Sequence, residues 1–78
     1  MLDSILLCLA DGFEDARMQY RTITPSGPEE YEPLRELMAT LIAEGLVVRY
    51  PGFEMYKLTN AGYLKFKPRI DAMRALPA

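Results

Sequence analysis

The chain has 78 residues, half of them hydrophobic, and a formal net charge of −2. This length suffices for one domain, residues 1–78, and the hydrophobic content excludes a globally disordered chain. With one cysteine and no histidine, the chain forms no intrachain disulfide and lacks the commonest general base and a common zinc ligand.

The sequence predicts a cytoplasmic protein without membrane contact. Its longest apolar run is far shorter than the roughly 20 residues of a membrane-spanning helix. The N-terminus, Met1-Leu2-Asp3, lacks the positive charge that opens a signal peptide. We expect Cys8, within an apolar run, to be a small buried hydrophobe.

Two helices are predicted in the first third of the chain. Residues 3–11 are expected to be helical because their apolar residues recur at spacings of three and four. Residues 14–22 show similar spacing, and Glu14 and Asp15 come early, where a helix dipole favours acids. Alternation across residues 16–22 would also suit a strand, so this second helix competes with an extended alternative.

The clearest amphipathic stripe follows a loop. Two prolines and a glycine within residues 24–28 predict that loop. Pro33 suits the first position of a helix, which leaves its backbone donor unused. We predict a helix over 33–44, ended by Gly45. Its apolar stripe consists of Leu34, Leu37, Met38, Leu41 and Ile42.

A hairpin and a last helix complete the chain. Residues 46–50 and 53–58 have the β-branched, aromatic and alternating character of strands, with a turn at Pro51-Gly52. Thr59 can cap the final helix, which Pro68 should kink or divide. The apolar stripe of that helix is Phe66, Ile70, Met73 and Leu76.

Two segments resemble the winged helix-turn-helix families, including the MarR-like and PadR-like regulators. Residues 41–47 read Leu-Ile-Ala-Glu-Gly-Leu-Val, and residues 56–62 read Tyr-Lys-Leu-Thr-Asn-Ala-Gly. In those families a leucine-rich helix commonly ends in Glu-Gly-Leu-Val, and the wing returns as Tyr-x-Leu-Thr-x-x-Gly. The resemblance implies an α+β winged helix: a three-helix core, a two-stranded β-hairpin wing and an additional C-terminal helix.

The resemblance also implies binding of double-stranded DNA by a transcriptional regulator. The helix over 33–44 would enter the major groove, the hairpin would touch the backbone or minor groove, and the last helix would reach phosphates. Carried onto this sequence, the DNA contacts would be Arg35, Thr40, Arg49, Lys57, Lys65, Lys67 and Arg69. A homodimer could form through the apolar seam of Phe66, Ile70, Met73 and Leu76.

The distribution of charge supports two alternatives. Residues 1–44 carry nine acids and three bases, a net charge of −6, whereas residues 45–78 carry six bases and two acids, a net charge of +4. The basic half favours an anionic partner such as DNA. However, Glu29, Glu30 and Glu32 precede the expected recognition helix, and Arg35 is its only base. This departure favours a protein-protein interaction module without DNA binding.

The sequence gives little support for catalysis. It contains no glycine-rich phosphate loop, no cysteine pair and no nucleophile placed with a base. The acids Asp11, Glu14 and Asp15 cluster near an expected helix end, where capping explains them. We therefore expect neither an enzyme nor a bound cofactor or metal.

Overall fold

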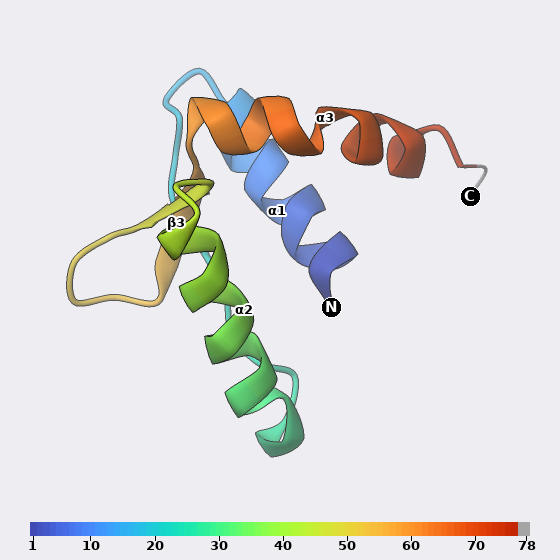
Figure 1. Cartoon of the computed structure of the whole chain (residues 1–78). Coiled ribbons are helices and arrows are strands. Elements are labelled where there is room, and N and C mark those ends of the chain that lie inside the picture. The colour runs from blue at the N-terminus through green and yellow to red at the C-terminus, as the bar shows by residue number, and fades with distance from the viewer. Residues whose placement is uncertain (77–78) are drawn as a thin grey trace.

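The helices and strands follow one another as α1 (Leu2–Glu14), β1 (Arg21–Thr22), α2 (Tyr31–Ala43), β2 (Val47–Arg49), β3 (Met55–Leu58) and α3 (Asn60–Arg74). A 3-10 turn, η1 (Pro28–Glu30), leads directly into α2. The computed structural model describes residues 1–76 (Figure 1). Over that range it confirms the α+β class, with three helices and one three-stranded antiparallel sheet.

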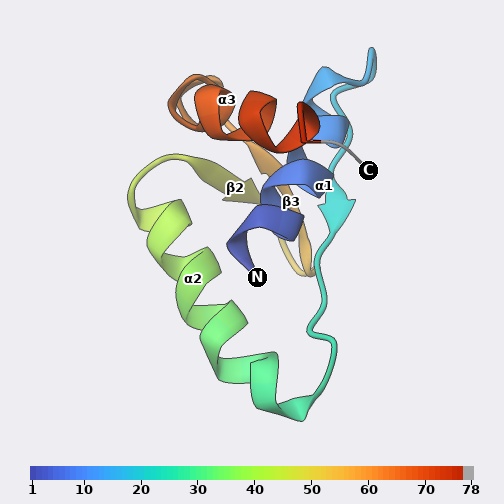
Figure 2. The ribbon, with the colours of Figure 1, turned by 90° about the vertical axis from the view of Figure 1, so that its right-hand side faces the viewer.

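The central strand of the sheet is β3, which pairs antiparallel with β1 on one side and β2 on the other. Tyr56 lies between Arg21 of β1 and Arg49 of β2, while Leu58 pairs with Val47. Because side chains alternate along a strand, Tyr56 and Leu58 are buried and Lys57 points to the opposite face. Figure 2 shows α3 above the strands and α2 below them and to the left, and both helices contribute side chains to the core on the buried face of the sheet.

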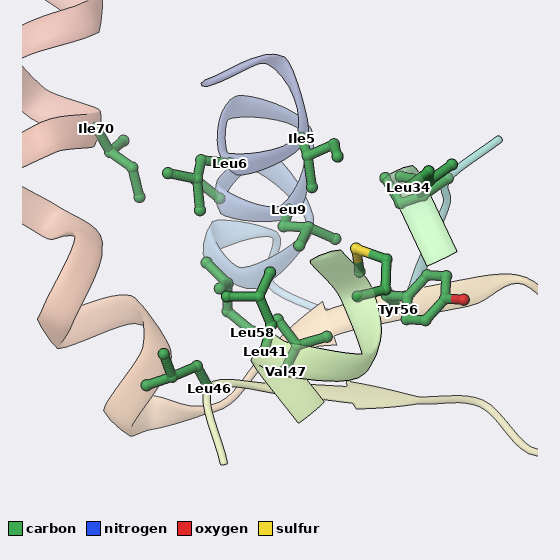
Figure 3. Packing of buried hydrophobic residues seen from close by; sticks show 13 residues of the cluster. Ile5, Leu6, Leu9, Leu34, Leu41, Leu46, Val47, Tyr56, Leu58 and Ile70 are labelled. Carbon is green, nitrogen blue, oxygen red and sulfur yellow. The ribbon is translucent and has the colours of Figure 1, made fainter. Parts of the chain in front are cut away.

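The hydrophobic core lies where α1 meets both β3 and α3. The most deeply buried side chains are at most 1% exposed and include Leu6 and Leu9 of α1, Leu58 of β3 and Ile70 of α3 (Figure 3). From α2, Leu34, Met38 and Leu41 also join this cluster. None of the helices within residues 1–76 is long and apolar enough to cross a membrane.

The second predicted helix, over 14–22, is wrong. α1 instead continues to Glu14, and the chain becomes extended at Asp15, whose carboxylate accepts a hydrogen bond from the Arg17 amide at 2.8 Å. Met18 then adopts a positive φ of 47°, which a helix cannot accommodate. Residues 21–22 are extended because their backbone groups form antiparallel β-sheet hydrogen bonds with β3.

The expected arrangement of four helices and a two-stranded wing therefore needs correction. Within the described residues, β1 replaces the missing helix and turns the hairpin into a three-stranded sheet. The helix over 33–44 is confirmed, although it begins at Tyr31 and ends at Ala43. The hairpin is also confirmed, with strands shorter than expected.

Pro68 does not divide the last helix into two, which was one of the two effects predicted for it, because α3 is continuous from Asn60 to Arg74. Proline removes the hydrogen bond to the carbonyl four residues earlier, which belongs to Leu64. The Leu64 side chain is 74% exposed, so water can reach that side of the helix and replace the missing donor.

A tight joint connects α2, the sheet and α3. Gly45 ends α2 with a φ of +74°, a conformation that favours glycine. The Thr59 hydroxyl caps α3 by accepting from the Gly62 amide at 3.0 Å, and it donates to the Gly45 carbonyl at 2.7 Å. Gly62 packs directly on the backbone of Leu46, where an added Cβ would overlap the carbonyl oxygen.

Candidate functional site

Two of the predicted phosphate contacts on α3 instead link α3 to other helices of the same chain. A guanidinium nitrogen of Arg69 lies 2.6 Å from a carboxylate oxygen of Asp3 on α1. The Lys65 ammonium lies 3.8 Å from the carboxylate of Glu44, which follows α2. Their positive charges are therefore shared with acids from the N-terminal half of the molecule.

The remaining predicted lysines also have partners. The Lys67 ammonium donates to both carboxylate oxygens of Asp71, at 2.9 and 3.0 Å, four residues further along α3. Lys57 has no carboxylate within 4 Å among the described residues, but its ammonium lies 4.8 Å from the centre of the Tyr20 ring. Such a cation–π contact leaves the Lys57 charge available to a further partner.

Among the described residues, Arg74 is the cation with the most carboxylate partners, although the sequence analysis did not single it out. Its guanidinium contacts Glu14 at 2.8 Å and Asp11 at 3.0 Å, both on α1. Glu14 also accepts a hydrogen bond from the Tyr63 hydroxyl at 2.5 Å. The hydrogen bonds from Arg74 and then Tyr63 lower the pKa of Glu14 from 4.5 to about 2.

The hairpin cation Arg49 is likewise engaged. Its Nε donates to the Phe53 carbonyl at 2.8 Å, and its terminal nitrogen donates to the Glu54 carboxylate at 2.7 Å. The Tyr56 hydroxyl donates to the other oxygen of Glu54, and this hydrogen bond lowers the pKa of Glu54. Burial, together with the bond to Glu54, raises the pKa of Tyr56 to about 12. Arg49 thus stabilises the hairpin through contacts within it.

On α2, the two predicted DNA contacts are exposed and weakly held. Arg35 lies 3.8 Å from Glu32, and both side chains are more than 70% exposed. Thr40 donates its hydroxyl to the Glu36 carbonyl at 3.0 Å, an internal helix contact. Neither residue is fixed in place by the rest of the fold.

Three of the four acids around the start of α2, unlike the acids of α1, have no cation within 4 Å among the described residues. Among the described residues, Glu29, Glu30 and Glu36 have no Lys or Arg within 4 Å. Glu30 accepts only a backbone hydrogen bond, from the Ser26 amide at 3.1 Å. With Arg35 as the single base, this segment presents negative charge to solvent.

A groove of about 380 Å³ lies between α2 and the inner face of the hairpin. We call it the α2 groove. Its α2 wall includes Leu34, Met38, Ala39 and Ile42, and its opposite wall includes Ile23. Polar groups gather at the hairpin end of the groove, namely Arg35, Arg49, Glu54 and Tyr56. The groove therefore combines apolar walls with two cations and one acid.

The predicted dimer seam is largely occupied by the core of the monomer. Ile70 is fully buried against the core, so it cannot present a surface to a second copy without rearrangement. Phe66 and Met73 are partly buried against the same cluster. Leu76 is 70% exposed. Leu64, which does not belong to the predicted stripe, is 74% exposed.

A second apolar surface lies on the outer face of the sheet. Tyr50 packs edge-on against Tyr20, with ring centres 5.3 Å apart, and is 5.6 Å from Phe53. Phe53 remains 57% exposed and the neighbouring Val48 37% exposed. Tyr50 and Phe53 flank the hairpin turn, and the added strand β1 brings Tyr20 to them.

Sequence reasoning missed the α2 groove because its walls come from three separate segments. Tyr31 and Ile42 are large apolar residues of α2, and the sequence analysis had placed Ile42 within its apolar stripe. In the structure they line the groove and remain 59% and 39% exposed. Ile23 and Pro25 could not have been assigned without the position of β1.

No family model matches the sequence, and no curated protein or solved structure matches it either. Among residues 1–76, no group of three or more potential His, Cys, Asp or Glu ligands lies together in a way that could hold a metal ion.

Proposed function

We propose that this chain is a winged-helix domain that binds another protein rather than DNA. The order α1-β1-α2-β2-β3-α3 and the glycine-ended helix that leads into a hairpin support a winged-helix arrangement. η1 is the only helical turn between α1 and α2 in the described chain, so the motif lacks a full helix before its presumed recognition helix.

One observation carries the proposal: the charge of the basic half is largely occupied within the chain. Of the six cations predicted to touch DNA, only Lys57 has no carboxylate within 4 Å in the described residues. Affinity for DNA depends on cations that replace counterions at phosphates. A cation already shared with a carboxylate must first give up that partner.

The helix that would enter the major groove is also unsuited to a polyanion. The preceding turn η1 carries Glu29 and Glu30, and the first turns of α2 carry Glu32 and Glu36, against the single base Arg35. Acids at a helix start are favoured by the helix dipole, but they repel the phosphate backbone. The α2 groove offers exposed apolar surface, which is typical of protein recognition.

A DNA-binding regulator remains the second candidate because three cations have no carboxylate within 4 Å among residues 1–76. These are Arg17, Arg21 and Lys57, around β1 and the hairpin. The hairpin turn also projects beside α2 (Figure 1), as a wing alongside a recognition helix would. Binding through these groups would depend on the hairpin more than on α2.

Fluorescence anisotropy with a mixed-sequence DNA duplex separates the two candidates. We expect no binding at low salt, about 20 mM, where even non-specific contacts are strong. The triple variant Arg49→Ala, Lys65→Ala and Lys67→Ala should lose thermal stability, because each side chain has an intrachain partner. Tight wild-type binding that weakens in the variant, with a flatter salt dependence, would overturn the proposal in favour of DNA.

A sizing run on the same samples tests self-association. Ile70 is inside the core, so the predicted seam offers a second copy mainly Leu76 and parts of Phe66 and Met73. We expect a monomer at micromolar concentration, since the remaining exposed seam is small for a stable interface. A dimer that persists on dilution would show that another surface mediates association.

A further inference from the structure

We infer that residues 24–43 open away from the rest of the fold as one unit. We call these residues the α2 segment, since they comprise the loop after β1, the turn η1 and the whole of α2. In the open form, α1, the sheet and α3 stay folded while α2 leaves the core. This motion does not depend on which partner the domain binds, so it is tested separately from the proposed function.

Polar contacts fix the chain at both ends of the α2 segment but not within it. Just before its start, the Ile23 amide donates to the Glu54 carbonyl at 3.1 Å. Just after its end, the Thr59 hydroxyl donates to the Gly45 carbonyl at 2.7 Å, and the Thr59 amide donates to the Leu46 carbonyl at 3.0 Å. Among the described residues, no hydrogen bond or ion pair joins the α2 segment to the rest of the fold beyond these ends.

The apolar contacts that hold α2 in place are shallower than those of the other elements. Leu34, Met38 and Leu41 are 8%, 3% and 5% exposed, whereas each of the largest fully buried side chains belongs to α1, β2, β3 or α3. The ion pairs of Arg69 and Arg74 also join α3 to α1. Because local opening is easiest where buried contacts are fewest, α2 should separate before α1 or α3 does.

The packing around the first turns of α2 is also incomplete. Leu34 borders the α2 groove of about 380 Å³ and a second cavity of about 70 Å³, which Ile5 of α1 and Pro25 also line. Atoms that face such space lack packing partners on that side and lose dispersion energy. The contact between α2 and α1 therefore opposes opening less than a closely packed contact would.

Opening changes the α2 groove itself. Leu34, Met38 and Ile42 line the groove from α2, whereas Ile23 and Tyr56 line it from the part that stays folded. The width of the groove therefore depends on the equilibrium between the closed and open forms. A ligand that binds only the closed groove would shift this equilibrium and slow the opening.

Native-state hydrogen exchange of the full chain, followed by ¹H–¹⁵N NMR at low urea concentrations, tests the inference. After correction for intrinsic rates, we expect the amides of Met38 and Leu41 to exchange about tenfold or more faster than those of Leu9 and Ile70. Their exchange should also depend less on urea, because opening the α2 segment exposes less surface than global unfolding. Exchange of all four amides at one rate and with one urea dependence would overturn the inference.

Two conservative variants, each lacking one carbon, separate opening of the α2 segment from global unfolding. Ile70→Val alters the part that stays folded, and Figure 3 shows Ile70 and Leu34 on opposite sides of α1. This variant should speed exchange at Leu9 about two- to tenfold and leave exchange at Met38 unchanged. Leu34→Val alters the α2 segment and should speed exchange at both amides by the same factor. If Ile70→Val accelerates Met38 as much as Leu9, α2 opens only by global unfolding and the inference is wrong.

Discussion

The helices α2 and α3 use their charges in opposite ways. The cations of α3 at positions 65, 67, 69 and 74 all lie within 4 Å of carboxylates, and three of them connect α3 to another part of the fold. The acids at the start of α2 contact solvent, and the single cation among them is weakly paired. Figure 2 places the two helices apart, with α1 close to α3.

This difference explains why the two halves of the sequence differ in charge. The acidic first half and the basic second half meet at the α1–α3 contact, through Asp3 with Arg69 and through Asp11 and Glu14 with Arg74. The basic half therefore has an anionic partner within its own chain. Unmatched acidic charge gathers in η1 and the first turns of α2, which makes that segment a candidate binding surface.

The largest expected effect concerns the joint between the two helices. Gly62→Ala would place a Cβ against the Leu46 carbonyl oxygen, so α3 would have to move away from the sheet. We expect a loss of roughly 3 kcal/mol or more of unfolding free energy, a large share for so small a domain. Urea unfolding measures this loss. Ala61→Ser, at the exposed neighbouring position, should change stability by less than about 0.5 kcal/mol.

The next effect contrasts two threonines. Thr59→Ala removes both the cap on Gly62 and the hydrogen bond to Gly45, and should cost about 1–2 kcal/mol in thermal or urea unfolding. Thr40→Ala removes only a hydroxyl that bonds back to Glu36 within α2, and should be neutral or slightly stabilising. Equal losses would show that the joint is not specially stabilised by Thr59.

The pH dependence of the unfolding free energy tests the difference between the paired acids of α1 and the unpaired acids of α2. The pKa of Glu14 in the folded chain, about 2, lies below its usual 4.5, so its stabilising contribution is present above about pH 4.5 and disappears as the pH falls toward 2. Glu14→Gln should lower the unfolding free energy at pH 7 by about 1 kcal/mol after allowance for solvent screening. It should also flatten the pH dependence between 4.5 and 2.

Glu36→Gln is the matched control for that experiment. Glu36 has no cation within 4 Å in the described residues, so its replacement should leave stability at pH 7 unchanged within about 0.5 kcal/mol. A comparable loss in both variants would remove the distinction between the acids of α1 and those of α2.

The smallest effect concerns two arginines. Arg69→Ala breaks the contact with Asp3 and should cost about 0.2–1 kcal/mol, as is typical of an exposed ion pair. Arg35→Ala, whose nearest carboxylate is 3.8 Å away, should cost nothing measurable. Thermal unfolding at low and high salt would compare them, and only the Arg69 effect should diminish with added salt.

Much of the fold could be predicted from local patterns. The stripe of α2, the stop at Gly45 and the alternation of β3 depend on neighbouring residues, and their structures were predicted correctly. The structure of residues 14–22 was not predicted correctly, because the spacing of their apolar residues suits a helix and a strand equally. The decision between them comes from pairing with Met55 and Tyr56, more than thirty residues later in the chain.

The candidate site was harder to predict from the sequence, because its contacts also join residues that are far apart in the chain. The sequence indicated which residues carry charge, and the acids before α2 were recognised as unsuited to DNA. It could not show that Arg69 and Arg74 lie against Asp3, Asp11 and Glu14, since these contacts join residues at least sixty positions apart. The α2 groove also requires the position of β1.

The central claim is that acids of the first half occupy the cations of the second half. A double-mutant cycle between Glu14→Gln and Arg74→Gln tests it most directly, with unfolding free energies measured in urea at pH 7. We predict a favourable coupling of about 0.5–1.5 kcal/mol that decreases as the pH is lowered toward 2. A coupling near zero would contradict the account and return the α3 cations to the list of free groups available for DNA.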